Sequence, residues 1–124
     1  MIKHIGSNEI ESALQKNPHQ YLAGNLKRPQ VLNHIRDDRA NVGIGTHSQC
    51  ECEKAHYHPK SREYQFCLKG EAEYYDLDNG NTVKIKEGDF FVIEENTKYS
   101  LRAHAGCRIL FFKVPAVDDK VLIE

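Results

Sequence analysis

The sequence predicts an all-β protein, an antiparallel sandwich or barrel of the double-sheet jelly-roll type. From about residue 30 onward, short runs of apolar or alternating residues are separated by turn residues such as DNGN at 78–81. These runs amount to about eight or nine strands. A chain of 124 residues is long enough to bury one core, so a single domain is expected.

One short helix is expected before the strands. Asn8 precedes Glu11 by three residues, which is typical of a capping box at a helix start. Apolar residues then recur on one helical face until Pro18 ends the pattern. This helix should be peripheral to the sheets.

The expected strands follow one another along the rest of the chain. They are QVLNHI at 30–35, NVGIGTHS at 41–48, the histidine segment at 55–58, EYQFCL at 63–68, EAEYYDL at 71–77, TVKIK at 82–86, FFVI at 90–93, KYSLRA at 98–103 and CRILFFKV at 107–114. The organisation predicted is an N-terminal helix and arm over 1–35, a barrel over 36–116 and a C-terminal tail over 117–124. The tail has no assignment beyond packing at a subunit interface.

Charge and composition narrow the range of partners and compartments. Lys and Arg number 17 against 18 Asp and Glu, with an isoelectric point near 6.6. No excess of positive charge exists to bind nucleic acid or an anionic membrane. The first residues contain no apolar run of signal-peptide length, so we expect a cytoplasmic protein.

The four cysteines are expected to be reduced thiols. Cys67 and Cys107 lie in apolar runs and are predicted to be small buried side chains. Cys50 and Cys52 could bind a metal, but no second cysteine pair at zinc-ligand spacing accompanies them.

Two histidines and a glutamate suggest a metal site. In an extended strand His56 and His58 point to the same face, roughly 6.5 to 7 Å apart along the chain. Glu63 begins the next run, where Gln65 and Cys67 share its face. Two imidazoles and a carboxylate suit divalent iron, manganese, nickel or zinc. The alternative is that all three are ordinary surface residues.

The spacing of these residues resembles the first signature of the cupin superfamily. That signature is His-x-His, four residues, Glu, six residues and Gly, and its fixed positions match His56, His58, Glu63 and Gly70. The resemblance covers about residues 40–114 and implies the double-stranded β-helix of cupins, with one divalent transition metal held by the two histidines and Glu63.

The second cupin signature is only partly matched, at residues 88–99. Gly88 agrees, Glu94 stands where proline is usual, and Asn96 stands for glycine. Tyr99 stands where the fourth metal ligand, a histidine, would be. Tyr99 could ligate the metal as a phenolate, act as a general acid or base, or pack in a site that has lost its metal.

Other polar residues could also reach a barrel interior. His47 is the most plausible of the scattered histidines, because its strand borders the barrel mouth, whereas His104 should face outward unless a bulge reverses it. Further candidates for the cavity wall are Gln65, Tyr74, Tyr75, Arg102 and Lys113.

The resemblance implies several functions. The first is a metal-dependent isomerase, epimerase or lyase that abstracts a proton from a sugar, sugar phosphate or hydroxy acid, with Tyr99 and Gln65 as catalytic residues. The alternatives are a non-haem iron dioxygenase, a non-catalytic sugar-binding or sensory module, and a metal-free sugar-nucleotide ketoisomerase. The resemblance also implies a homodimer and a small-molecule ligand.

Overall fold

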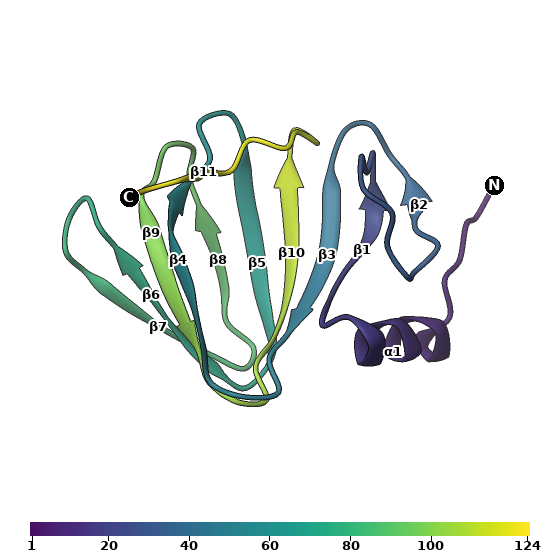
Figure 1. Cartoon of the computed structure of the whole chain (residues 1–124), viewed down its shortest axis with the longest axis horizontal. Coiled ribbons are helices and arrows are strands. Elements are labelled where there is room, and N and C mark those ends of the chain that lie inside the picture. Colours follow the sequence, from purple (N-terminus) through teal and green to yellow (C-terminus); the bar gives the residue numbers. More distant parts are fainter.

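A computed structural model describes all residues from 1 to 124 and contains one helix and eleven strands (Figure 1). The elements are α1 (Ser7–Lys16), β1 (His19–Gly24), β2 (Ile35–Arg36), β3 (Asn41–Thr46), β4 (Glu51–Tyr57), β5 (Arg62–Lys69), β6 (Glu71–Asp76), β7 (Thr82–Lys86), β8 (Phe90–Ile93), β9 (Tyr99–Ala103), β10 (Arg108–Val114) and β11 (Val121–Leu122).

The strands form two sheets that face each other. One has the order β2-β1-β3-β10-β5-β8 and the other β11-β4-β9-β6-β7, with antiparallel pairing except between β1 and β2. Buried side chains from both sheets, among them Cys67, Leu101 and Ile109, form the core between them. The all-β, double-sheet prediction is confirmed, as is the burial of Cys67 and Cys107.

The helix is present, but the predicted capping box is wrong. α1 begins at Ser7 with Gly6 as its N-cap, and no side chain caps it, so Asn8 lies inside the first turn. Glu11 instead forms an ion pair with Arg108 on β10, with Oε2 and Nη2 3.0 Å apart. At ten residues, α1 is too short to cross a membrane, and the structure has no other helix.

The N-terminal arm contains a strand that the sequence analysis missed. β1 pairs antiparallel with β3 and lengthens the larger sheet, while the predicted strand at 30–35 is a loop except at Ile35. Side-chain amides replace the expected ladder: Gln30 accepts from the Tyr21 amide at 2.8 Å and donates to its carbonyl at 2.7 Å. Gln20 accepts from the Leu32 amide in the same way.

The C-terminal tail packs against the barrel of the same chain. Val121 and Leu122 form β11, which pairs with Tyr57 and His56 of β4. The tail therefore adds an edge strand beside the end of β4, where His56 lies.

The backbone conformation explains one departure from the second cupin signature, the asparagine at position 96 in place of glycine. Asn96 has φ of 64°, and no other non-glycine residue has a positive φ. Asparagine is one of the few residues that adopt this left-handed conformation at low cost, so it can replace glycine here.

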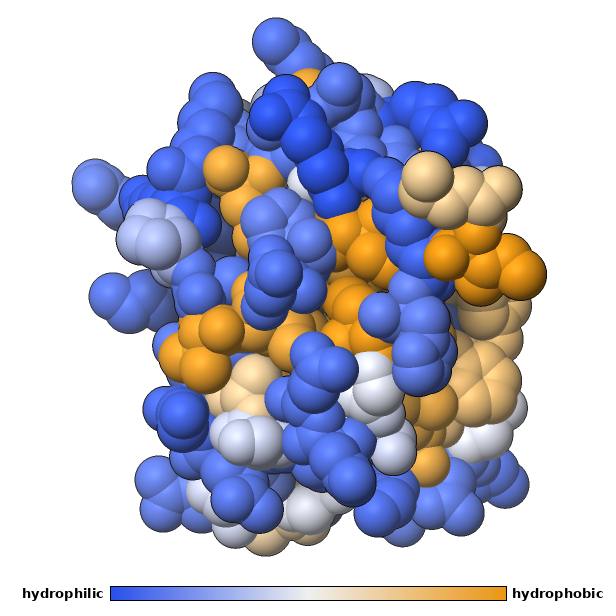
Figure 2. Space-filling view, turned by 90° about the vertical axis from the view of Figure 1, so that its right-hand side faces the viewer, coloured by the Kyte–Doolittle hydropathy of each residue, from blue (hydrophilic) through white to orange (hydrophobic).

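The larger sheet is packed against the helix at its β1 end, whereas the outer face of β5, β8 and β10 is exposed to solvent. Ala13 and Leu14 of α1 are buried beside β1. Over β5, β8 and β10 no element covers the outward side chains, and Phe66, Phe90 and Phe112 are 38%, 65% and 42% exposed. Figure 2 shows the side that carries α1 and β2, where apolar side chains also reach a mostly polar surface.

Candidate active site

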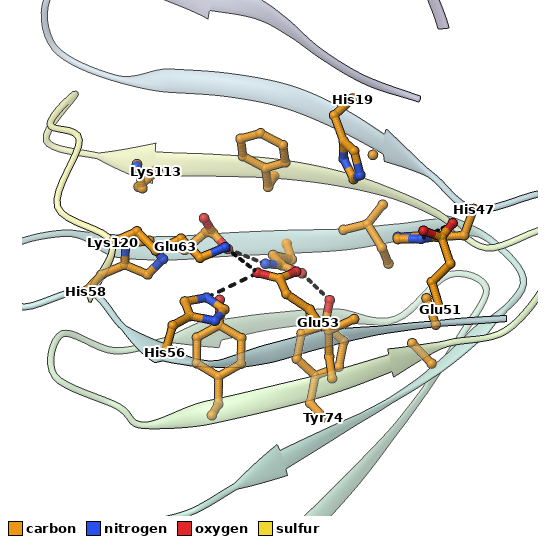
Figure 3. Close-up of a pocket in the computed structure, with 18 of the residues that line it drawn as sticks. His19, His47, Glu51, Glu53, His56, His58, Glu63, Tyr74, Lys113 and Lys120 are labelled. Carbon is orange, nitrogen blue, oxygen red and sulfur yellow. Dashed lines mark hydrogen bonds and ion pairs between the residues drawn. The ribbon is translucent and has the colours of Figure 1, made fainter. Parts of the chain in front are cut away.

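A cavity of about 480 Å³ lies between the two sheets and contains most of the predicted site residues. Its titratable side chains gather at two ends (Figure 3). One end has Glu53, His56, His58, Glu63, Lys113 and Lys120, and the other has His19, His47 and Glu51.

His56 and His58 are both buried and held in one tautomer. Nδ1 of His56 donates to the carbonyl of Lys54 at 2.8 Å, and Nδ1 of His58 donates to the Asp119 carboxylate at 2.9 Å. Each ring therefore keeps Nε2 as its basic nitrogen. Burial lowers the pKa of both histidines, which favours the neutral form that binds metals.

Asp119 connects His58 to the C-terminal tail. Its carboxylate also accepts from the backbone amides of Lys60 and Ser61 at 2.9 and 2.8 Å and from the Ser61 hydroxyl at 2.8 Å. Burial alone would raise the pKa of Asp119, but the hydrogen bonds from His58, Lys60 and Ser61 lower it to about 2. The carboxylate is thus ionised at neutral pH and orients the His58 ring.

Glu63 lies on β5 with its carboxylate in a hydrogen-bonded chain. The Gln65 amide donates to Glu63, and the Tyr74 hydroxyl donates to Gln65 Oε1 at 2.6 Å. Burial raises the pKa of Glu63. As predicted, Glu63, Gln65 and Cys67 share the inward face of β5.

Tyr99 lies directly across from His56 in the pairing of β4 with β9. The two ring centroids are 4.4 Å apart, and Tyr99 is only 4% exposed. Burial, with the nearby Glu63 and Glu53 carboxylates, raises the pKa of Tyr99 well above its ordinary value. Its hydroxyl makes no hydrogen bond to another residue, and at neutral pH it is a neutral phenol.

The histidines and Glu63 face the same end of the cavity without closing around one point. No group of three His, Cys, Asp or Glu side chains has metal-binding geometry in this structure. Glu53 Oε1 lies 3.3 Å from His56 Nε2 and 3.1 Å from Lys120 Nζ. Two neutral imidazoles and two carboxylates are nevertheless a donor set that suits a divalent transition metal.

Sequence reasoning missed Glu53, and a β-bulge explains why. Simple alternation from His56 would place Glu53 on the opposite face. The register of β4 against β9 shifts between Glu53 and His56, however, so both line the cavity. Asp119 and Lys120 were missed because they lie far from the signature in sequence and reach the site only through β11.

Of the other residues predicted as candidates for the cavity wall, some line the cavity and others face outward. Lys113 and His47 line the cavity as anticipated, and of the two adjacent tyrosines it is Tyr74 that does so. Arg102 is exposed and contacts Cys50. His104 faces outward, as predicted, and its Nε2 lies 2.5 Å from Glu73 Oε2. Tyr75 does not line the cavity.

His19 joins His47 at the far end of the cavity, although its isolated position in the sequence gave no signal. The two ring centroids are 5.6 Å apart, and His47 Nδ1 lies 3.2 Å from Glu51 Oε1. Burial lowers the pKa of His19, helped by His47. His19 reaches this end because β1, which the sequence analysis missed, places its side chain over Gly45 of β3.

The family model for the cupin domain matches residues 47–112, which include the first signature, Glu53 and Tyr99. This chain belongs to the cupin family. The match covers β4 to β10 apart from the last two residues of β10, so both sheets of this cupin contribute to it.

Relatives and solved structures agree with that assignment. The cupin is 36% identical over 70 residues to an L-ectoine synthase of Hyphomonas neptunium, a match that covers 53% of this chain and 52% of the synthase. The chain thus spans about half the length of that relative. KdgF from Halomonas sp. matches with a TM-score of 0.63 at 14% identity, covering 82% of this chain and 80% of KdgF. The nucleoside dehydratase Pac13 matches with a TM-score of 0.61 at 16% identity, over 71% of each chain. At these identities the two structures show a shared fold.

Proposed function

We propose that this cupin is a metal-dependent enzyme that abstracts a proton from a small oxygen-rich molecule, in an isomerase, epimerase or lyase reaction. One observation carries the proposal: His56 and His58 each have Nδ1 held by an acceptor, so Nε2 is the basic nitrogen of both rings at the end of the cavity that contains Glu63 and Glu53. The 36% identity to an ectoine synthase over part of the chain supports an enzymatic role.

His56, His58 and Glu63 would hold one divalent iron, manganese, nickel or zinc ion. When bound, the ion supplies a Lewis acid that polarises a carbonyl or hydroxyl of the substrate. Burial also favours this arrangement, because a desolvated carboxylate such as Glu63 is stabilised by a cation beside it.

The residues around the ligands have separate roles in this proposal. Tyr99 is a proton donor, because it lines the cavity beside His56 and its hydroxyl makes no hydrogen bond to another residue. Gln65 has no proton of suitable acidity and positions Glu63 through its amide. Glu53 is a general base, since its carboxylate lies in the cavity and contacts both His56 and Lys120.

A metal-free acid–base site is the second candidate. The 3.3 Å contact between Glu53 Oε1 and His56 Nε2 favours it, because a carboxylate–imidazole pair can transfer protons without an ion. Such a site would suit the sugar-nucleotide ketoisomerase reaction. The iron dioxygenase and the non-catalytic module have no contact in their favour and rank lower.

Metal content tests the proposal directly. Protein purified without chelator or nickel resin should contain about one equivalent of a transition metal by inductively coupled plasma mass spectrometry, and His56→Ala and Glu63→Gln should lose it. His104→Ala is the matched control, since this histidine lies outside the cavity. Metal-free wild-type protein that turns over sugar nucleotides in the presence of a chelator would instead establish the second candidate.

We also propose a cytoplasmic homodimer that pairs through the outer face of β5, β8 and β10. Phe66 lies opposite Phe90 in register, and Tyr64 lies within 6.1 Å of the Phe90 ring and 6.4 Å of the Phe112 ring, so the aromatic side chains form one exposed patch. Apolar areas of this kind commonly become interfaces. Sedimentation velocity should give a dimer for the wild type and a monomer for Phe90→Ser; a monomeric wild type would refute the proposal.

A further inference from the structure

Lys113 is a buried cation in the wall of the cavity. It lies on the inward face of β10, opposite Glu63 in the pairing of β10 with β5, and is only 6% exposed. Figure 3 shows it at the same end of the cavity as His58, Glu63 and Lys120. Lysine is seldom buried this deeply unless its ammonium group has a partner.

The ammonium group of Lys113 makes no hydrogen bond in the structure. The nearest acidic oxygen is Asp119 Oδ1, at 3.9 Å, which exceeds hydrogen-bond length. That carboxylate already accepts from His58, Lys60 and Ser61. Asp119 thus supplies a nearby opposite charge but leaves the three donors of Lys113 unused.

We infer that Lys113 anchors an anionic oxygen group of the substrate, the carboxylate of a hydroxy acid or the phosphate of a sugar phosphate. The Lys113 ammonium group borders the cavity without a hydrogen-bond acceptor, and an anion entering the cavity would supply one. Lys120 lies at the same end, but its ammonium group is paired with Glu53 Oε1 at 3.1 Å, so Lys113 is the cation left for the anion.

This inference rests on the proposed function and narrows its substrate class. Because Lys113 is a cross-strand neighbour of Glu63, a group held by Lys113 lies beside the end of the cavity where His58 and Glu63 meet. A molecule with a hydroxyl or carbonyl close to its anionic group could reach both. Neutral sugars would leave Lys113 unpaired and should bind poorly.

Calorimetric titration with three probes tests the inference. Gluconate carries a carboxylate, glucose 6-phosphate carries a phosphate, and sorbitol is the neutral alcohol that corresponds to gluconate. The proteins are the wild type, Lys113→Met, Lys113→Arg and, as a control, Lys84→Met, whose lysine is exposed on β7 and outside the cavity. Circular dichroism establishes first that each variant is folded, and Lys113→Arg keeps the charge if the methionine variant does not fold.

The wild type should bind at least one anionic probe more tightly than sorbitol. Lys113→Met should weaken that binding by about tenfold or more and leave sorbitol unchanged, while Lys113→Arg should restore part of it. Binding of gluconate alone would identify a hydroxy acid, and binding of glucose 6-phosphate alone a sugar phosphate. Equal or absent binding of anionic and neutral probes, or undiminished anion binding by Lys113→Met, would overturn the inference.

Repeating the titrations with a chelator separates this inference from the proposed function. If the metal proposal fails but Lys113 is the anchor, the preference for anions persists in protein that contains no metal. The opposite case is that the metal proposal holds and Lys113 is not the anchor. The wild type then contains a metal that His56→Ala lacks, but it binds anionic and neutral probes equally well.

Discussion

Replacing Asp119 with asparagine removes the charge that joins the C-terminal tail to the loop carrying His58. The change in the pKa of Asp119 from its ordinary 3.8 to about 2 corresponds to about 2 kcal/mol of folding free energy at pH 7. The side chain is only 5% exposed, so solvent screens little of this contribution. We expect Asp119→Asn to lower the free energy of unfolding by about that amount.

The loss should depend on pH in a defined direction. A carboxyl group with a lowered pKa in the folded state stabilises the protein above its unfolded pKa, and this stabilisation disappears as the pH falls through the folded pKa. For Asp119 the contribution should fall from about 2 kcal/mol at pH 7 to about 1 kcal/mol at pH 3.

Urea unfolding followed by circular dichroism, in the presence of a chelator, measures these differences. Asp118→Asn is the matched control, because Asp118 is exposed and makes no hydrogen bond; it should change stability by less than about 0.5 kcal/mol. The reasoning would be refuted if Asp119→Asn were no more destabilising than Asp118→Asn, or if its effect grew toward low pH.

Substitutions at three further positions test other parts of the structure by thermal unfolding and, at Tyr99, also by turnover. Asn96→Ala should cost about 1 kcal/mol, whereas Asn96→Gly should be tolerated, because φ is 64° there; equal effects would contradict the left-handed conformation. Gly43→Ala should cost about 1 to 3 kcal/mol, since its new methyl group would meet the Phe111 ring, and an unchanged melting temperature would place that ring elsewhere. Tyr99→Phe should change stability by less than about 1 kcal/mol, because its hydroxyl makes no hydrogen bond, yet abolish turnover; an active variant would exclude Tyr99 as the proton donor.

Local patterns in the sequence were sufficient for the all-β, double-sheet fold class and for the inward face of β5. Alternation along a strand depends only on backbone geometry, so the shared orientation of Glu63, Gln65 and Cys67 could be predicted. The same rule failed at Glu53, where a bulge between Glu53 and His56 breaks the alternation. A bulge arises from pairing with a neighbouring strand, and single-strand periodicity contains no signal for it.

The N-terminal segment also contains one element that local periodicity predicts and one that it does not. The apolar face of α1 followed from helical periodicity, and burial of Ala13 and Leu14 confirmed it. Strand β1 could not be predicted in this way, because its residues neither alternate clearly between polar and apolar nor form an apolar run. Gln20 and Gln30 hold the following loop through side-chain amides, which are contacts between residues that no short-range pattern pairs.

The sequence was enough to predict a two-sheet fold of the cupin type and the common location of His56, His58 and Glu63, which line one cavity. It could do so because the spacing of those residues and the strand periodicity are local properties of the chain. Three relations appear only in the folded protein: Asp119 orients His58, Glu53 contacts His56, and Lys113 is buried near them without a hydrogen bond. These relations join segments far apart in the chain, or depend on the register between strands, and they exist only once the two sheets and the tail have packed.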